Sequence, residues 1–578
     1  MIRTLESDDP RFKTLTFGPG LNILLADRLD DGDQSTSSTK QRRTRNGAGK
    51  SSFIDIVHFL LGGRADGALG STALAHSTFS GAFGSPLDGK LVVDRSLIKP
   101  RVIRRHATVT TETSVGAYTQ DLGREWFKLD DGQASGSPTF RQLMAYFARR
   151  RREGGYDHPV RTFRVQSSAS SEVNLAYLFG LDAEIVRRLH VAKSALKQND
   201  AARKVLRDLD KAAGGSVRTD LEAQLSARIA AASLARDALR KRIESFNVLP
   251  AFRELERELS GLHQDARDLS DADVLDQEVI ELNLRALGTE TPASPPDLEA
   301  LYGEAKIVFP DLVARRYAEV AQFHTRLIEN RREHLESEIS AARQRIEVRG
   351  GARETLEARR RSITASLRVS GPAEELLALR DELSGRESEV RNLEGRLVEA
   401  RRLDDHAEAL DRDIEDAVRA RRADRRERSA IVDEASRTFS AISGRLYEQP
   451  GQLAISATET GLKFLPSTPS DHSAGVMSME IFCFDWTIAT LCAKRGMGPG
   501  FLIHDSHLFE PVDGRQFGRA LALGAQLAVE TGVQYLVTLN SDELDRAEAE
   551  SEQDLRSYVV NTRLSDQPDG GLFGIRFD

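Results

Sequence analysis

The sequence predicts an α/β protein whose globular part is split between the two chain ends, with a long antiparallel coiled-coil hairpin inserted between them. Three observations lead to this fold class. Mixed strand and helix patterns occupy residues 1–182 and again 441–578. The residues between them are rich in Arg, Glu, Leu and Ala, with apolar side chains at coiled-coil spacing. A phosphate-loop pattern follows the first strands, and a strand ending in aspartate lies in the last quarter.

Composition agrees with a globular part beside long solvated helices. The chain has 578 residues, more than one ordinary domain needs, with 29% charged and only 6% aromatic residues. No run approaches about 18 apolar residues, so no membrane span is expected. The N-terminus lacks an apolar signal core.

Cysteine content and net charge limit the kinds of site and the binding partners that this protein can have. The two cysteines, Cys483 and Cys492, exclude a disulfide framework and a four-ligand zinc site. A reducing cytoplasm fits these features. The net charge of -8 means that any contact with nucleic acid requires local basic patches.

The first segment, 1–182, begins with a strand pattern. FKTLTFGPGLNILLA (12–26) predicts a strand, a Gly-Pro-Gly turn and a second strand with alternating apolar residues. Residues 27–43 are too hydrophilic to pack and predict a mobile loop inserted before the phosphate loop. KLVVDRSL and RVIRRHATVTTETSV have strand character because they are rich in Val, Ile and Thr.

The helical insertion divides into an outgoing arm (183–285), a tip (286–315) and a returning arm (316–440). Prolines at 292, 295, 296 and 310 stop helices near the tip. Pro250, Gly350–Gly351 and Gly371–Pro372 are expected to interrupt the arms. A set of shorter packed helices is the alternative. Coiled-coil seam spacing is followed by Leu221, Leu225, Ile229 and Ala232, and by Leu383, Val390, Leu393, Leu397 and Ala400.

The last segment, 441–578, is globular again. QLAISAT and GLKFLP predict paired strands, and GFLIHDS and QYLVTLNS predict buried parallel strands followed by polar residues. FGRALALGAQLAVETG predicts a helix ended by Gly532.

A phosphate loop is predicted at TRNGAGKS, Thr44–Ser51. It fits G-x-x-x-x-G-K-[ST] except that Thr44 replaces the first glycine. Backbone N–H groups at the following helix N-terminus would surround phosphate oxygens, Lys50 would reach the β/γ-phosphates, and Ser51 would hold Mg²⁺. ATP and Mg²⁺ are therefore the predicted cofactors. The predicted loop contacts are Asn46, Gly47, Ala48, Gly49, Lys50, Ser51 and Ser52.

Asp505 is the predicted strand-end ligand of Mg²⁺, after Phe501, Leu502 and Ile503. Many P-loop ATPases place a glutamate directly after this aspartate to polarise the attacking water, but Ser506 stands here. Either His507 or Glu510 replaces that base, or hydrolysis is slow.

The phosphate loop lies near one end of the chain and the Asp505 strand near the other, with the coiled-coil hairpin between them. This order of segments resembles the SMC-like ATPases, the group that includes SbcC and RecN. The resemblance implies a P-loop ABC-type head made from both chain ends, and two heads that enclose two ATP molecules. It assigns Gln166 to sensing Mg²⁺ and the γ-phosphate. It assigns Ser473 and Gly475, in SAGVMSMEIFCFD, to a degenerate signature loop acting on the neighbouring head's nucleotide. It places Asp513 in the loop that meets the opposite head and Asn540 where a switch histidine usually stands.

A narrower resemblance rests on RNGAGKSSFIDIVHFLLG, FHTRLIENRREHL, FLIHDSHLFEPVDGRQ and QYLVTLNSDEL. These stretches look like a domain-of-unknown-function family of SMC-like proteins that supplies the ATPase of bacterial ABC-three-component systems, which are associated with anti-phage defence. It implies a homodimer through ATP-bound heads, a small accessory subunit and an effector encoded nearby, and a role in sensing or acting on DNA. The hairpin tip carries no CxxC, which disfavours a zinc-hook dimer.

Three basic patches are candidates for sequence-independent contact with duplex DNA: Arg42, Arg43 and Arg45; Lys99, Arg101, Arg104 and Arg105; and Arg149 to Arg152. A solvated basic face is the alternative for each. The leading function is an ATP-driven DNA clamp. The alternative is a weakly hydrolysing, ATP-gated scaffold that holds a separate effector. A nuclease lacks an independent carboxylate cluster, and a small-molecule kinase would not need the helical insertion.

Overall fold

The computed structural model describes residues 1–27, 49–84, 90–106, 109–130, 134–212, 220–245, 250–289, 311–367, 371–447, 449–468, 473–551, 554–565, 567 and 569–575. The chain forms two compact units. The head unit combines Met1–Asp200 with His406–Asp578, and the arm unit is Ala201–Asp405. The head unit therefore takes in the first part of one arm helix and the last part of another.

A six-stranded antiparallel sheet in the head unit has the strand order β2-β1-β4-β5-β6-β7. It contains the strands predicted at KLVVDRSL and RVIRRHATVTTETSV and the first strand of the 12–26 pattern, whereas β1 and β4 were not predicted. Gly81 of β4 lies opposite Leu5 of β1, where an added Cβ would lie 2.8 Å from the Leu60 side chain, so helix and sheet pack closely there. The strands are β1 Ile2–Ser7, β2 Leu15–Thr16, β4 Thr78–Gly84, β5 Lys90–Ser96, β6 Val102–His106 and β7 Thr110–Ser114.

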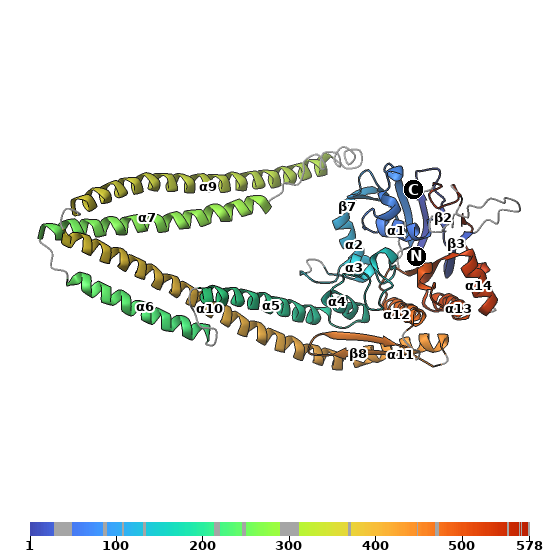
Figure 1. Cartoon of the computed structure of the whole chain (residues 1–578). Helices are drawn as coiled ribbons and strands as arrows, with labels where there is room; N and C mark the ends of the chain where they lie inside the picture. Colours follow the sequence, from blue (N-terminus) through green and yellow to red (C-terminus); the bar gives the residue numbers. More distant parts are fainter. Residues whose placement is uncertain are drawn as a thin grey trace, which may run out of the picture. The chain divides into compact units, whose positions relative to one another are not determined.

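A second, parallel sheet joins the two chain ends. Its order is β10-β11-β3-β12, with β10 Phe501–His504, β11 Gln534–Asn540, β3 Leu21–Asp27 and β12 Leu564–Ser565. Tyr535 pairs with Leu21 and Asn540 with Ala26, so the N-terminal strand lies beside the C-terminal one (Figure 1). β3, β10 and β11 are almost wholly buried apolar runs, as parallel strands covered on both faces require. The predicted α/β head made from both ends is confirmed.

Helix α1, Lys50–Leu60, contacts strands of both sheets. Its apolar face is fully buried, and the ring of Phe59 meets Phe79 of β4 edge-on with centroids 6.4 Å apart. Phe53 packs on Phe17 at 5.4 Å. These contacts fix the position of α1, and with it of Lys50 at its start, against the core of the head unit.

The other head helices are α2 Val115–Phe127, α3 Phe140–Met144, α4 Ser168–Phe179, α11 Ser429–Leu446, α12 Ala474–Lys494, α13 Gly514–Thr531 and α14 Ser541–Ser551. The hairpin β8 Gln452–Ala457 and β9 Leu462–Ser467 pairs as predicted. Helix α13 ends at Gly532, whose φ of 70° is the left-handed conformation that favours glycine.

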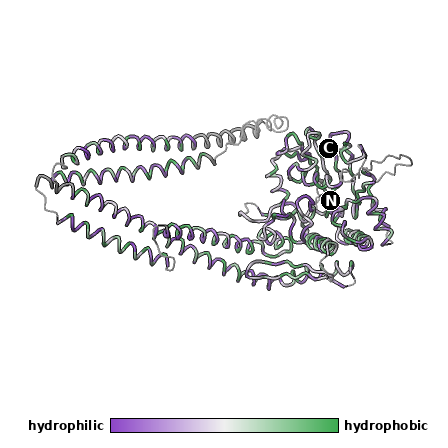
Figure 2. The backbone as a smooth tube through the Cα atoms, in the orientation of Figure 1, coloured by the Kyte–Doolittle hydropathy of each residue, from purple (hydrophilic) through white to green (hydrophobic). Residues whose placement is uncertain are grey.

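Helix α12 is the apolar centre of the C-terminal half. By length and composition it could cross a membrane, but 83% of its most apolar window is buried in the protein. It contacts α4, α11, α13 and β10, which is the environment of a core helix. Figure 2 shows apolar residues gathered in the head unit and alternating with hydrophilic ones along the arm helices.

The arm unit is built from antiparallel helix pairs. Glu222 and Arg240 of α6 pair with Arg401 and Glu387 of α10, so one helix rises in number as the other falls. The predicted seam is confirmed: Leu225 and Ala232 are buried against Val390, Leu393 and Ala400, with Leu221, Ile229 and Leu397 beside them. Leu383 is outside this cluster. The helices are α5 Ala183–Ala212, α6 Leu221–Glu244, α7 Pro250–Thr289, α9 Asp311–Leu367 and α10 Gly371–Glu427.

The second pair, α7 with α9, lies side by side (Figure 1) and is joined by ion pairs. Arg349 of α9 bonds Asp273 of α7 at 2.7 Å and also pairs with Asp276, which Arg345 contacts as well. The predicted breaks at Pro250 and Gly371–Pro372 fall at the first residues of α7 and α10. Most of the predicted tip, including its four prolines, lies outside the described residues.

The predicted break at Gly350–Gly351 is wrong, because α9 continues through both glycines. A helical glycine costs only about 1 kcal/mol relative to alanine. The Arg345 and Arg349 pairs directly before the glycines attach α9 to α7 and oppose a break.

Truncation of the buried seam should destabilise the arm unit. Leu225 is fully buried, and Leu225→Ala is expected to cost about 2–5 kcal/mol because it leaves a cavity between α6 and α10. Leu234 of the same helix is 77% exposed, so Leu234→Ala is the matched control and should cost less than about 0.5 kcal/mol. Urea unfolding followed by helical circular dichroism measures both; equal effects would contradict the assigned seam.

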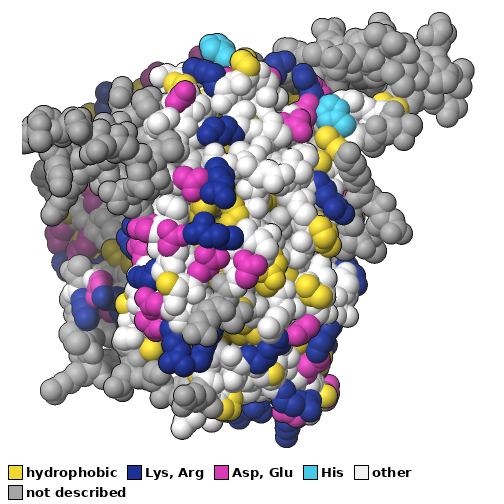
Figure 3. Space-filling model, turned by 90° about the vertical axis from the view of Figure 1, so that its right-hand side faces the viewer, with side chains coloured by type: hydrophobic (Ala, Val, Ile, Leu, Met, Phe, Trp, Pro, Cys, Tyr) yellow, Lys and Arg dark blue, Asp and Glu magenta, His cyan; other side chains and the backbone are white. Residues whose placement is uncertain are grey.

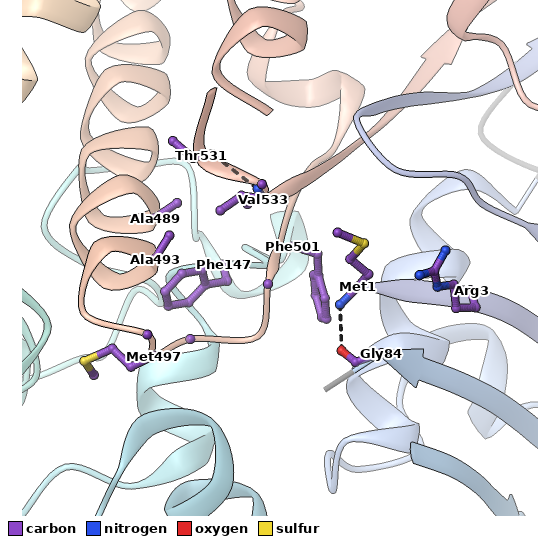
Figure 4. A pocket seen from close by; sticks show the side chains of 14 residues that line it. Met1, Arg3, Gly84, Phe147, Ala489, Ala493, Met497, Phe501, Thr531 and Val533 are labelled. Atoms are coloured by element: carbon purple, nitrogen blue, oxygen red, sulfur yellow. Dashed lines mark hydrogen bonds between the residues drawn. The ribbon is translucent and has the colours of Figure 1, made fainter. Parts of the chain in front are cut away.

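A cavity of 290 Å³ lies at the amino ends of β10 and β11, lined by Phe147, Ala489, Ala493, Phe501 and Val533 among others (Figure 4). The amino group of Met1 donates to the Gly84 carbonyl at its edge, at 3.0 Å. None of the predicted site residues that the structure describes lines this cavity.

Candidate functional site

The carboxyl ends of the parallel strands gather the predicted site. Asp505 follows β10, Asn540 ends β11, and β3 precedes the phosphate-loop segment. Parallel strands all end at one edge, and ligands of open α/β sheets bind there. The first residues of α1, Lys50 and Ser51, reach this edge.

Side chains from opposite chain ends are in direct contact at this edge. The ammonium of Lys50 donates to Oδ1 of Asn540. The hydroxyl of Ser51 donates to Oδ2 of Asp505 at 2.8 Å, across 454 residues of sequence. The structure therefore brings together Lys50, Ser51, Asp505 and Asn540.

Gly49 shapes the start of α1. It has a φ of 82°, and a Cβ there would lie 2.8 Å from that of Leu572, so glycine is required twice over. Among the described residues no side chain caps α1 at Gly49, and the first-turn amides of Lys50, Ser51 and Ser52 lie at this helix N-terminus. The predicted contacts Asn46, Gly47 and Ala48 lie outside the described residues.

Asp505 is 3% exposed and is oriented by three groups. Its Oδ1 accepts from the hydroxyls of Ser506 and Thr538, each at 3.3 Å. Its backbone N–H donates to the Tyr156 hydroxyl at 2.9 Å. With Oδ1 occupied, Oδ2 is directed at Ser51. A hydroxyl and a carboxylate oxygen 2.8 Å apart fit Mg²⁺, which takes one or two protein ligands and fills its shell with phosphates and waters.

A cavity of 420 Å³ opens at this place, lined by Ser51, Ile54, Asp55, Arg150, Arg151, Arg152 and Asp505. The arginine run predicted as a DNA patch is part of its wall and its support. Arg149 is 1% exposed and Arg150 6% exposed, so both are wrong as DNA contacts. Arg150 is held by Asp55 at 2.8 Å and Glu153 at 2.7 Å.

A buried ion pair supports the strand end from behind. Arg149 makes two 2.7 Å bonds to Asp485 of α12, and both side chains are fully buried. His504, next to Asp505, bonds Asp485 at 3.3 Å and the Tyr535 hydroxyl at 3.0 Å. Burial lowers the pKa of His504 and raises that of Tyr535. These contacts connect α12 to the end of β10.

The two candidates for the hydrolytic base form a pair. His507 Nδ1 lies 2.8 Å from Glu510 Oε2, and Arg151 lies 3.5 Å from the other oxygen of Glu510. The His507 ring meets Tyr156, the residue that also contacts Asp505, with centroids 6.0 Å apart. Ser506, directly after Asp505, supplies a hydroxyl and no carboxylate.

Gln166 lies in a different environment. Its side-chain oxygen accepts from the backbone N–H of Thr162 at 2.8 Å. Among the described residues, no recorded contact joins Gln166 to Ser51 or Asp505. Its assignment as the Mg²⁺ sensor stays a prediction.

The predicted signature loop and the Asp513 loop adjoin each other. Ser473 caps α12 by accepting from Val476, and a Cβ on Gly475 would lie 2.7 Å from the Pro511 carbonyl oxygen. Asp513 caps α13 by accepting from Gln516 at 3.0 Å. Both helix starts form one surface, and their action on a neighbouring head stays a prediction.

His58 links α1 to the segment that carries the arginines. Its Nε2 lies 2.8 Å from the Ala148 carbonyl oxygen, and Nδ1 lies 3.1 Å from Arg141. A neutral ring that donates from Nε2 and accepts at Nδ1 satisfies both contacts. Burial lowers the pKa of His58 well below its usual 6.5, and the charge of Arg141 lowers it further.

Acid should therefore weaken folding through His58. Below pH 6.5 the unfolded chain binds a proton that the native ring refuses, so the unfolding free energy falls as pH falls, by up to about 1.4 kcal/mol per pH unit. His58→Gln should flatten the slope between about pH 6 and 5, measured by urea unfolding. An unchanged slope would contradict a neutral native His58.

The other basic patches differ in exposure. Lys99 and Arg101 are exposed; Arg104 pairs with Glu112 at 2.7 Å, and Arg105 with Glu125 at 3.0 Å. Figure 3 shows basic and acidic side chains interleaved over the face of the head unit that it draws. Arg42, Arg43 and Arg45 lie outside the described residues.

Sequence reasoning missed several supporting residues. Tyr156 and Thr538 orient Asp505 from distant positions, and no local pattern marks them. Glu543 accepts from the Asn540 backbone N–H at 2.7 Å, and burial raises its pKa. The N-x-x-E spacing at the start of α14 is a capping signal that could have located Glu543.

Both chain ends share a parallel sheet, a Gly-Lys-Ser helix start lies at its edge, and an antiparallel coiled coil is inserted between them, which is the arrangement that the sequence predicted. Residues 442–577 match the family described as an uncharacterised protein conserved in bacteria (DUF2326). Residues 277–390 match C-terminal domain 10 of the ABC-three component (ABC-3C) systems. These two matches confirm the predicted resemblance to a domain-of-unknown-function family and to the ABC-three-component systems.

Two solved structures are similar to the chain at low identity. The Smc head domain with a coiled coil and joint from Pyrococcus yayanosii is 14% identical, with 99% of this chain and 96% of that chain covered and a TM-score of 0.34. The Smc head domain with an extended coiled coil bound to the C-terminal domain of ScpA, from Pyrococcus furiosus, is 13% identical, with coverage of 95% and 91% and a TM-score of 0.32. No curated protein matches the sequence.

Proposed function

We propose that the chain is an ATPase whose nucleotide site is assembled from both chain ends and whose ATP-bound heads pair. The observation that carries this is the pair of contacts Lys50–Asn540 and Ser51–Asp505, which unite a phosphate-loop helix with two strand ends. A helix N-terminus, a lysine and a pair of oxygen ligands together suit the phosphates of Mg²⁺-bound ATP.

Each group has a defined task in this proposal. The first-turn amides of α1 and Lys50 bind the β/γ-phosphates, and Lys50 exchanges Asn540 for phosphate. Ser51 and Asp505 hold Mg²⁺, which supplies charge stabilisation to the phosphates when bound. Asn540 donates a hydrogen bond to the γ-phosphate. His507 with Glu510 takes the proton of the attacking water, because Ser506 has no basic group.

The wider role draws on the surfaces and on the family matches. Ser473, Gly475 and Asp513 lie on adjoining helix starts and contact the nucleotide of a second head, which makes a homodimer. The ABC-3C match over the arm supports a small accessory subunit and an effector. Duplex DNA is bound or sensed without sequence preference, in the cytoplasm, in anti-phage defence.

A second candidate is a weakly hydrolysing, ATP-gated scaffold that holds and releases the effector. Ser506 favours it, because the position after the metal-binding aspartate carries no carboxylate. The clamp turns ATP over faster on DNA, whereas the scaffold binds ATP with little turnover.

ATP hydrolysis by the purified full chain, with and without linear duplex DNA, separates the two functions. Stimulation by DNA that Lys50→Ala abolishes supports the clamp. Tight ATP binding with no turnover under either condition supports the scaffold and contradicts an ATP-driven clamp formed by this chain alone.

A further inference from the structure

Arg151 is a cation on the wall of the cavity that Ser51 and Asp505 also line. Its neighbours in the arginine run pair with other carboxylates: Arg149 with Asp485, Arg150 with Asp55 and Glu153, and the 43% exposed Arg152 with Asp55 at 3.2 Å. Among the described residues, the one ion pair recorded for Arg151 is a single 3.5 Å contact with Glu510. Both side chains are nearly half exposed, at 49% and 45%.

This contact is weak for physical reasons. An exposed pair with a single long N–O contact is screened by water and ions. A phosphate offers several anionic oxygens in the geometry that the guanidinium fork bonds in parallel. A nucleotide phosphate in the cavity would therefore compete successfully with Glu510 for Arg151.

Release of Arg151 would also change the contacts of the Glu510 carboxylate. Glu510 holds Arg151 with one oxygen and His507 with the other, at 3.5 Å and 2.8 Å. Loss of the guanidinium leaves the carboxylate with only His507 as its recorded partner, among the described residues. Nucleotide occupancy is thereby communicated to the pair that faces Tyr156 and the Asp505 loop.

We propose that Arg151 is a nucleotide-sensing residue: it pairs with Glu510 in the empty head and moves onto the terminal phosphate when ATP binds, which releases the Glu510–His507 pair from the guanidinium. This rests on the proposed ATP site and adds a residue that discriminates ATP from ADP. The exchange of Arg151 from Glu510 to the phosphate is driven by electrostatic attraction and involves no covalent step.

The test is the affinity of the full-length protein for fluorescent mant-ATP and mant-ADP with Mg²⁺. Arg151→Ala should weaken ATP binding about tenfold and ADP binding less than about twofold, since one charge-assisted phosphate contact is lost. Arg164→Ala is the matched control: Arg164 pairs with Asp157 at 3.2 Å and is 78% exposed, so both affinities should stay unchanged. Circular dichroism checks that each variant is folded.

Glu510→Gln tests the competition directly. Removing the competing carboxylate should tighten ATP binding about threefold, and that gain should vanish in the Arg151→Ala/Glu510→Gln double variant, because the two residues act through one contact. An ATP-to-ADP preference that Arg151→Ala leaves intact overturns the inference, as does a Glu510→Gln gain that survives in the double variant. If the wild type binds ATP and Lys50→Ala does not, such a result leaves the proposed function standing; if the wild type binds neither nucleotide, both fail.

Discussion

Asp505→Asn is expected to reduce Mg²⁺-dependent ATP turnover by about 10³-fold, because a neutral amide replaces the carboxylate that contacts Ser51. Loss of metal charge stabilisation on the order of 4 kcal/mol corresponds to that factor. Asparagine keeps the shape and can still accept from Ser506 and Thr538, so the fold should be retained. Steady-state phosphate release measures the effect.

Ser506→Ala is the companion variant for this prediction. It removes only one of the two hydroxyl donors to Oδ1 of Asp505, since Thr538 remains at 3.3 Å. Turnover should fall less than about tenfold, the loss of a single hydrogen bond of roughly 1 kcal/mol. Equal losses in both variants would contradict the assignment of Asp505 as the metal ligand.

Asp485→Ala should destabilise the head unit by about 3–5 kcal/mol, because it leaves the Arg149 guanidinium buried without its carboxylate. Asp157→Ala breaks the exposed pair with Arg164 and should cost less than about 1 kcal/mol. Chemical denaturation followed by tryptophan fluorescence reports on the head unit, since Trp126 and Trp486 are both buried there.

The double variant Arg149→Met/Asp485→Leu sharpens this test. Replacement of both charges by apolar side chains removes the desolvation cost as well as the attraction, so it should be less destabilising than Asp485→Ala alone. A double variant that is as unstable as the single one would show that the remaining Arg149 carbonyl contacts, such as 2.7 Å to Gly155, matter more than the ion pair.

Much of the architecture was predictable because its signals are periodic or local. The seam of Leu225, Ala232, Val390 and Leu393 follows from spacing alone. Buried strands followed by Asp505 and Asn540 predict a shared edge, because parallel strands end together. The interruption expected at Gly350–Gly351 failed because tertiary ion pairs outweigh a small propensity cost.

The residues that hold the site in place were harder to predict from the sequence. A run of four arginines has no periodicity that separates the buried Arg149 from the half-exposed Arg151. Tyr156 and Asp505 are 349 residues apart, so their contact depends on the whole head. One signal was available: Asp485 interrupts the apolar stretch IFCFDWTIATLC, and a charge in such a helix requires a buried partner.

The central claim is that both chain ends form one site for Mg²⁺-bound ATP. Equilibrium binding of mant-ATP to the wild-type protein and to Lys50→Ala, with and without Mg²⁺, tests it most directly. The account predicts Mg²⁺-dependent binding by the wild type and a loss on the order of tenfold or more in Lys50→Ala, because a charged phosphate contact disappears. Absence of ATP binding by the wild type, or equal binding by Lys50→Ala, would contradict it.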